Sequence, residues 1–171
     1  MSRIATIAPG DPAAPPPAAK NGFPPRYRRW HPGEMASTGY SGTPLPQKLG
    51  IKEGCKLAVV NAPSTWALGV LPAGVTMQRS LAGKAMLDVL VVFVTRRVDL
   101  VSRIATCRPR MQPAAGLWIA WPKRASGMAT DVTENTVREI ALPTGLVDNK
   151  VCSIDDTWSA LRLVIRLELR P

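Results

Sequence analysis

Hydrophobic and polar positions divide the chain into short apolar runs separated by segments rich in proline, glycine and polar residues. The densest run, residues 89–94 (VLVVFV), is uniformly apolar, which is typical of a strand covered on both faces. Similar runs predict buried strands at residues 56–62 and 116–121, and a short strand at residues 75–79. Residues 146–154 and 158–169 flank a polar turn and predict an antiparallel hairpin.

Three helices are expected between these strands. Residues 66–71 predict a short helix that ends before Pro72, and residues 96–111 predict a longer amphipathic helix. Asp131 and Glu134, spaced as in a capping box, predict the start of a third helix. The apolar positions assigned to one face of the second helix are Val98, Val101, Ile104 and Ala105.

Alternating strands and helices indicate an α/β fold. Because parallel strands need crossover connections, this order predicts a Rossmann-like three-layer sandwich with a mostly parallel sheet and a C-terminal antiparallel hairpin. Residues 39–171 are expected to form this single domain. Residues 1–38 are rich in Pro, Ala and Arg, lack hydrophobic periodicity and predict a disordered extension. Met35 is a candidate for the natural start of the protein.

Hydropathy and cysteine content indicate where in the cell the protein is expected to act. The mean hydropathy of +0.01 suits a soluble globular protein, and no apolar run approaches the roughly 20 residues of a membrane helix, so no membrane partner is expected. Three widely spaced cysteines without a C-x-x-C pair argue against a disulfide framework or a zinc site and favour a reducing, cytoplasmic location.

A net charge of +10 raises the possibility of nucleic-acid binding. The basic residues are dispersed, apart from a cluster in the N-terminal extension, so a generally basic protein is favoured and nucleic acid is left as an alternative partner through that arm. The clustered residues are Arg26, Arg28 and Arg29.

The candidate binding site follows from the fold. In open α/β sheets ligands bind beyond the carboxyl ends of the parallel strands. Polar residues that follow the first, third and fourth predicted strands are therefore candidate ligand-binding groups, and a helix start near Ser64 would favour an anion. Lys123 could pair with a phosphate or a carboxylate, although a solvated strand-end lysine is the simpler interpretation. The candidate residues are Asn61, Ser64, Thr65, Thr95, Lys123, Ser126 and Gly127.

Residue types that usually perform catalysis are sparse. His31 is the only histidine and lies in the predicted extension, which argues against a histidine-based triad or metal site. Asp155 and Asp156 are adjacent, so their side chains diverge, and a turn is favoured over a cation site. No catalytic residue, metal or cofactor is therefore assigned from the residues themselves.

Several motifs resemble the bacterial family catalogued as domain of unknown function 3052. The likeness covers about residues 38–170, and the family implies a fold and a start near Met35 rather than a reaction. The motifs are residues 39–54 (GYSGTPLPQKLGIKEG), 60–63 (VNAP), 117–123 (LWIAWPK), 125–127 (ASG) and 151–159 (VCSIDDTWS).

The element order also resembles, more distantly, the Rossmann core of class I methyltransferases, which implies an S-adenosyl cofactor at the strand-end crevice. The chain departs from that pattern in two places. Residues 61–63 (NAP) stand where methyltransferases place glycines, and Arg79 stands where an acidic residue would bind the ribose hydroxyls.

Two functions from different classes follow. The main prediction is a non-catalytic Rossmann-like protein that binds a small molecule or a protein partner. The alternative is a divergent enzyme of methyltransferase-like fold that uses a nucleotide-type or S-adenosyl cofactor.

Overall fold

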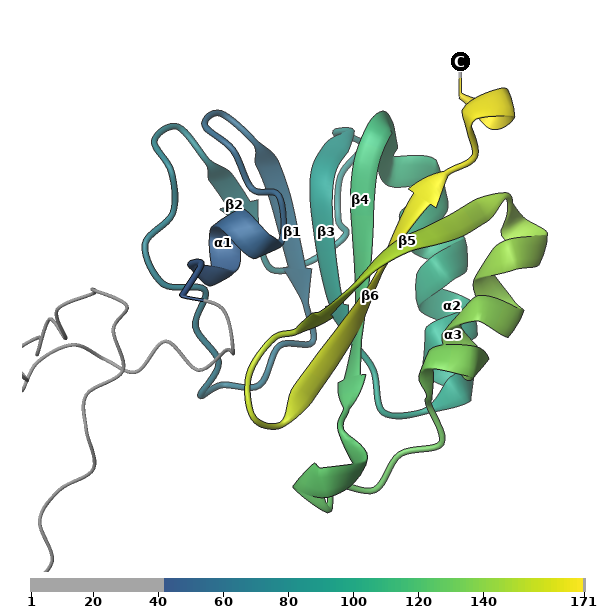
Figure 1. Cartoon of the computed structure of the whole chain (residues 1–171). Coiled ribbons are helices and arrows are strands. Elements are labelled where there is room, and N and C mark those ends of the chain that lie inside the picture. Colours follow the sequence, from purple (N-terminus) through teal and green to yellow (C-terminus); the bar gives the residue numbers. More distant parts are fainter. Residues whose placement is uncertain (1–41, 171) are drawn as a thin grey trace, which may run out of the picture. The chain divides into compact units, whose positions relative to one another are not determined.

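A computed structural model describes residues 42–170, which form a six-stranded sheet with helices packed on it (Figure 1). The strands lie in the order β2-β1-β3-β4-β6-β5. The first four are parallel, whereas β6 is antiparallel to both β4 and β5. The strands are β1 (Lys56–Val60), β2 (Thr76–Gln78), β3 (Leu87–Phe93), β4 (Met111–Pro122), β5 (Leu146–Ser153) and β6 (Trp158–Ile165).

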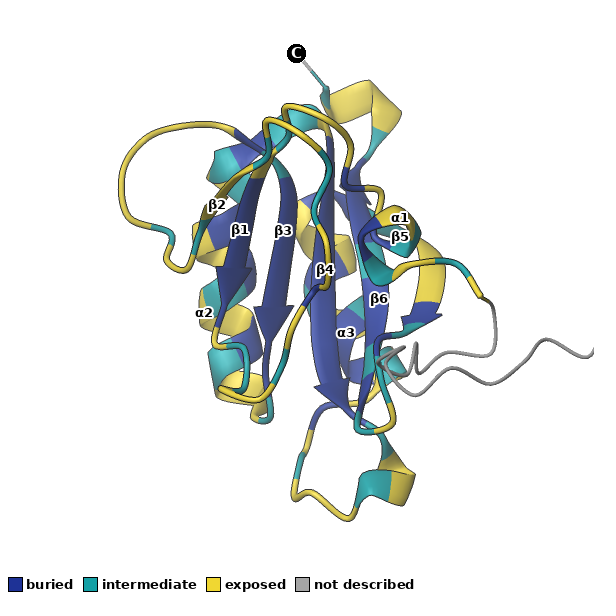
Figure 2. Cartoon of the chain, turned by 90° about the vertical axis from the view of Figure 1, so that its left-hand side faces the viewer, coloured by how far each residue is buried: buried dark blue, intermediate teal, exposed yellow. Residues whose placement is uncertain are grey.

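Two longer helices cover one face of the sheet, and a short helix with connecting segments covers the other (Figure 2). The helices are α1 (Leu45–Lys48), α2 (Arg97–Cys107) and α3 (Glu134–Ala141). Alternation along the strands supplies both cores, because successive side chains point to opposite faces. Leu90 and Val92 of β3 pack toward α2 and α3, whereas Val91 and Phe93 pack toward α1. The Rossmann-like α/β fold with its antiparallel hairpin is thereby confirmed.

The buried face of α2 differs from the expected one. Val98 and Val101 are 67% and 50% exposed, and the side chains that enter the core are Leu100, Ile104 and Cys107. These three positions follow an i, i+4, i+7 pattern, which aligns them along one side of the helix. The assignment of Val98, Val101 and Ala105 to the buried face is therefore wrong, and Ile104 alone of that set is buried.

The connection between β1 and β2 contains no helix, so the helix expected at residues 66–71 is wrong. This segment instead covers the α1 side of the sheet with single side chains. The ring of Trp66 packs edge-on against Phe93 at 4.8 Å, and Phe93 packs in the same way against Trp158 at 5.0 Å. Leu68 of this connection is also buried, in the core on the α1 side. The six residues 66–71 are too few for a helix to be stable without tertiary support, and their contacts with the sheet hold the chain in an irregular path instead.

Some predictions fall outside the described residues. These are the extension at residues 1–38, the candidate start Met35, the arginine cluster and His31. Of the helices that residues 42–170 form, none has the length and apolar character that a membrane span requires.

Candidate functional site

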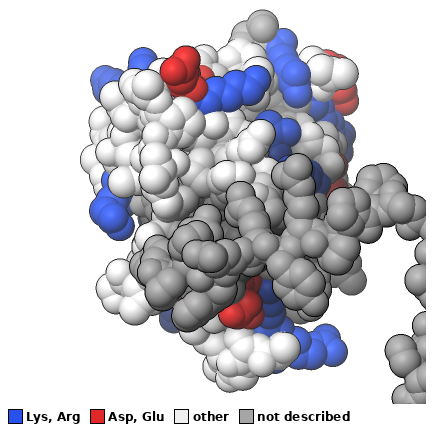
Figure 3. All heavy atoms as spheres, turned by 60° about the vertical axis from the view of Figure 1, so that its left-hand side comes forward, with Lys and Arg blue, Asp and Glu red and all other residues white. Residues whose placement is uncertain are grey.

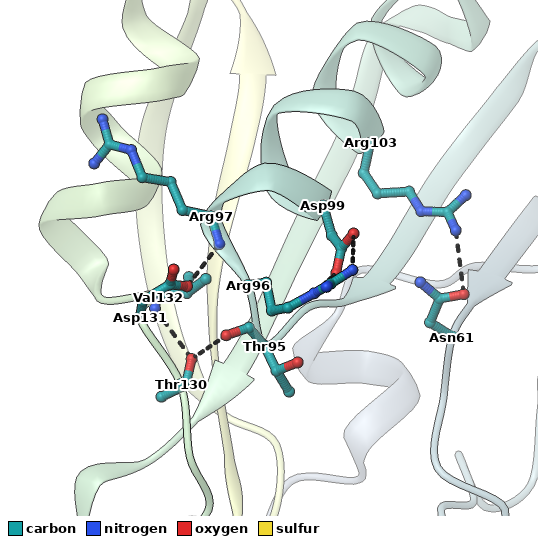
Figure 4. A network of polar contacts seen from close by, with 9 residues as sticks. All are labelled: Asn61, Thr95, Arg96, Arg97, Asp99, Arg103, Thr130, Asp131 and Val132. Atoms are coloured by element: carbon teal, nitrogen blue, oxygen red, sulfur yellow. Dashed lines mark hydrogen bonds and ion pairs between the residues drawn. The ribbon is translucent and has the colours of Figure 1, made fainter.

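The carboxyl ends of β1 and β3 lie side by side and carry a network of polar groups (Figure 4). Asn61, the first residue after β1, has a φ of +56° and is the only described non-glycine residue with a positive φ. Asparagine tolerates this left-handed conformation better than most residues. Its side-chain oxygen accepts a hydrogen bond from Arg103 Nη2 of α2 at 3.4 Å. The chain therefore makes a glycine-like turn at the end of β1 without a glycine.

The end of β3 is tied to the loop that precedes α3. The carbonyl oxygen of Thr95 accepts hydrogen bonds from Thr130 Oγ1 at 2.8 Å and from the Asp131 amide at 3.3 Å. Asp131 Oδ1 in turn accepts a hydrogen bond from the backbone N–H of Arg97, the first residue of α2, at 2.6 Å. A carboxylate at this position satisfies an otherwise free helix amide and is favoured by the helix dipole.

Asp131 therefore caps α2 rather than the helix that follows it in the chain. The N-cap of α3 is Thr133, whose hydroxyl accepts the amide of Thr136 at 3.2 Å. Glu134 lies in the first turn of α3 and pairs with Arg138. The capping-box expectation for Asp131 is wrong, because the carboxylate bonds to an element more than thirty residues away in the chain.

We expect Asp131→Ala to lower the free energy of unfolding by about 1 kcal/mol, the usual cost of removing a helix cap. Asp131→Asn keeps an acceptor oxygen and should lose less than half of that amount. Urea denaturation followed by circular dichroism measures both variants. Equal losses in the two variants would show that the negative charge matters more than the hydrogen bond.

Two arginines at this edge are already paired with carboxylates. Arg96 donates from Nε and Nη2 to the two oxygens of Asp99 at 2.8 and 2.9 Å, which raises the pKa of Arg96 and lowers the pKa of Asp99. Arg97 forms an ion pair with Glu139 at 2.8 Å. Within the described residues, Arg79 after β2 and Arg103 on α2 take part in none of the ion pairs. The edge therefore carries two guanidinium groups without a carboxylate partner in residues 42–170.

Arg103 was not among the residues predicted for the site. The signal that could have identified it is its spacing from Arg96 and Asp99, since positions i, i+3 and i+7 share one side of a helix. These three side chains extend along α2 toward the end of β1, as Figure 4 shows.

The predicted site residues near Lys123 form a separate group. The Lys123 ammonium donates to Ser153 Oγ at 2.7 Å and to the carbonyl oxygen of Asp155, both in the β5–β6 hairpin. Ser126 Oγ donates to the Lys123 carbonyl at 2.7 Å, and Gly127 ends this turn with a φ of +69°. The lysine thus holds the hairpin against the end of β4.

Ser64 and Thr65 are exposed in the connection after β1. Because no helix begins there, the anion site expected at a helix start near Ser64 has no helix amides to form it. Of the seven candidates, the structure therefore brings Asn61 and Thr95 to one network and keeps Lys123, Ser126 and Gly127 in another.

The described residues offer little for metal binding. No cluster of three or more His, Cys, Asp or Glu side chains occurs within residues 42–170. The carboxylate of Asp155 accepts hydrogen bonds from the amides of Thr157 at 2.8 Å and Trp158 at 2.7 Å. This geometry is that of an Asx turn closing the hairpin.

No protein-family model matches the chain, and no curated protein sequence matches it either. The resemblance to domain of unknown function 3052 therefore stays a prediction. Solved structures do match. A SAM-dependent methyltransferase from Aquifex aeolicus aligns over 70% of this chain and 87% of its own, with 13% identity and a TM-score of 0.51. The fibrillarin pre-rRNA processing protein of Methanococcus jannaschii aligns over 75% and 71%, with 13% identity and a TM-score of 0.49.

The first of these likenesses shows the fold. The sheet of this chain, with four parallel strands followed by an antiparallel pair, belongs to the Rossmann-like architecture of that methyltransferase. At this level of identity the comparison assigns neither substrate nor reaction to the chain.

Proposed function

We propose that this chain binds an adenine-type cofactor at the carboxyl ends of β1 and β3, as a divergent protein of methyltransferase-like fold. The observation that carries the proposal is the left-handed turn at Asn61, directly after the first parallel strand, β1. In open α/β sheets this is the position from which the backbone approaches a bound cofactor. The fold likeness to a SAM-dependent methyltransferase supports a cofactor-binding protein of this kind better than a purely non-catalytic role.

The charges at this edge favour a phosphate-bearing nucleotide over S-adenosylmethionine. Arg79 follows β2, where an acidic residue would accept the ribose hydroxyls, and arginine is a donor that suits a phosphate instead. Arg103 adds a second guanidinium group beside Asn61. S-adenosylmethionine carries a positive sulfonium, which two nearby cations would repel. The residues present therefore fit a nucleotide phosphate better than the sulfonium cofactor.

Calorimetric titration of the full chain with ADP and with S-adenosylmethionine tests the proposal. We expect saturable binding of ADP that weakens roughly tenfold in Arg103→Gln, since one charge-assisted contact is removed. Arg124→Gln removes the same charge from an exposed turn elsewhere and serves as the matched control. Asn61→Gly should retain binding because glycine adopts a positive φ, whereas Asn61→Val should reduce it because a β-branched residue does not.

Two results would overturn the proposal. One is the absence of saturable binding for both ligands. The other is binding that responds equally to Arg103→Gln and to Arg124→Gln, which would indicate attraction by net charge alone. Binding of S-adenosylmethionine without ADP would keep the site and reverse the choice of cofactor.

A second candidate function is that of a non-catalytic binding protein, and one observation supports it. The polar groups at this edge are bonded to one another: Asp131 to the start of α2, and Arg96 to Asp99. The Lys123 ammonium is held by the hairpin. Groups engaged in this way are poorly placed for proton transfer. A chain that binds nucleotide without turning it over would support this function.

A further inference from the structure

A cavity of about 410 Å³ lies on the α1 face, toward the amino-terminal ends of the parallel strands. It is therefore at the opposite end of these strands from Asn61. Its charged lining comes from α1, the loop before β1, and strands β3, β5 and β6. We call it the basic cavity; its charged residues are Lys48, Lys52, Asp88, Lys150 and Arg162. Four cations thus face one carboxylate, and Figure 3 shows several Lys and Arg side chains beside few acidic ones in this view.

Arg162 is the clearest sign that the cavity is more than a surface hollow. It points to the same face of β6 as the buried Trp158 and Ala160, so a charge interrupts an otherwise apolar row. Partial burial lowers its pKa, with Arg170 contributing in the same direction. The one hydrogen bond that its side chain makes within the described residues is a long contact of 3.5 Å from Nη1 to Asn149 Oδ1. The guanidinium is therefore partly desolvated without a carboxylate, which is costly unless an anion binds it.

Gly116 of β4 makes room for this arginine. A Cβ atom at Gly116 would lie 2.6 Å from Arg162 Nε and 3.1 Å from its Nη2. The guanidinium thus lies directly over the glycine backbone. A glycine inside a strand often marks such a close approach.

Lys150 is also held in place. Its ammonium donates to the Lys48 carbonyl at 3.0 Å and lies 5.9 Å from the ring centre of Trp118. Trp118 is fixed in turn, because its Nε1 donates to the Leu49 carbonyl at 2.9 Å in a buried position. A positioned lysine loses less side-chain entropy when it binds a ligand than a free one.

We propose that the basic cavity binds a compact phosphate-bearing small molecule. Its volume falls within the range that small ligands occupy. The fork of Arg162 suits the bidentate recognition of a phosphate, and Lys150 adds a second charge from the neighbouring strand. The cations converge on one hollow instead of forming the stripe that is typical of nucleic-acid binding. The proposal does not depend on the site at Asn61.

Calorimetric titration of the full chain with ribose 5-phosphate, at low salt, is the direct test. We expect saturable binding that weakens with added salt and falls roughly tenfold or more in Arg162→Gln and in Lys150→Gln. Arg124→Gln and Lys84→Gln remove the same charges from exposed positions outside the cavity and should bind like the unmodified chain. Gly116→Ala keeps every charge but displaces the guanidinium, so it should also weaken binding. Circular dichroism checks that each variant is folded.

Each of the next four results would overturn the proposal. The first is no saturable binding of ribose 5-phosphate, and the second is equal weakening by Arg162→Gln and Arg124→Gln. Succinate binding as tightly as ribose 5-phosphate would refute the phosphate preference. A single-stranded oligonucleotide that binds through Arg162 and Lys150 while ribose 5-phosphate fails to displace it would assign the surface to nucleic acid instead. Loss of ADP binding in Arg103→Gln but not in Arg162→Gln separates this cavity from the edge at Asn61.

Discussion

Trp118→Ala is expected to lower the free energy of unfolding by about 3 to 5 kcal/mol, among the largest effects of any single substitution in the described residues. Trp118 has no exposed surface and lies in the core between the sheet and α1. Truncation to alanine would leave a large cavity there. It would also free the Leu49 carbonyl that the indole N–H now satisfies at 2.9 Å. Urea denaturation monitored by circular dichroism gives the difference.

Trp118→Phe separates packing from hydrogen bonding. Phenylalanine retains most of the aromatic volume but cannot donate to Leu49, so the loss should be smaller, about 1 to 3 kcal/mol. A loss in Trp118→Phe that matches the alanine variant would show that the hydrogen bond to the Leu49 carbonyl outweighs the packing. A loss below about 1 kcal/mol in Trp118→Ala would contradict the assigned core, since fully buried aromatic residues do not behave in that way.

Helix α2 shows which structural features hydrophobic periodicity alone could predict. Two apolar stripes run along it: Leu100, Ile104 and Cys107 on one side, and Val98, Val101 and Ala105 on another. Both stripes have helical spacing, and each therefore predicts an amphipathic helix equally well. The helix itself was predictable from the sequence. Which stripe is buried depends on how the helix lies on the sheet, and that is decided by tertiary packing.

The strands were predictable for a related reason. Residues 89–94 are apolar at every position, so both faces must be covered whatever the register. The turn at Asp155 was also readable, because an Asx turn is a local hydrogen-bond pattern. Local chemistry and uniform burial are the features that one sequence can specify without knowledge of the tertiary fold.

Long-range contacts explain most of the differences between the predicted and the observed candidate site. Asp131 caps α2 because the loop before α3 passes the end of β3, a juxtaposition that no local motif records. Lys123 bonds to Ser153 because β6 brings the hairpin beside the end of β4. From the sequence, Lys123 could be placed at the correct edge of the sheet, and Asp131 only near the start of the following helix. It could not specify which partner lies within reach of each side chain.

The basic cavity was harder to predict from the sequence than the strands or the turn at Asp155. Its cations come from positions 48, 52, 150 and 162, and only the fold brings them together. The trace that it leaves in the sequence is Arg162, a charge in the alternating run of the last strand at a position that otherwise faces the core. A charged residue in such a row requires either a partner or a ligand. Arg162 stands out in this way only once the strand has been assigned.

We expect the free energy of unfolding to fall at alkaline pH because of the buried thiol of Cys107. The thiol is fully buried at the end of α2, and burial raises its pKa from about 9 to about 12, although Arg103 and Arg110 oppose the change. Above pH 9 the thiol ionises in the unfolded chain but stays protonated in the folded one. The unfolded state then binds fewer protons, so stability falls as pH rises, by about 1.4 kcal/mol per pH unit.

The Cys107→Ala variant isolates this contribution. Lysine and tyrosine side chains also titrate at alkaline pH, but they do so in both proteins and cancel in the comparison. Between pH 9 and 10.5 the unmodified chain should lose roughly 1.5 kcal/mol more than Cys107→Ala, measured by urea denaturation with reductant present. Below about pH 8 the difference between the two should be constant, because the thiol is protonated in both the folded and the unfolded state. Cys107→Ser, which does not titrate here, should follow the alanine variant. Parallel curves for all three proteins up to pH 10.5 would mean that the thiol ionises equally in the folded and unfolded chain, which a buried position in the α2 core does not allow.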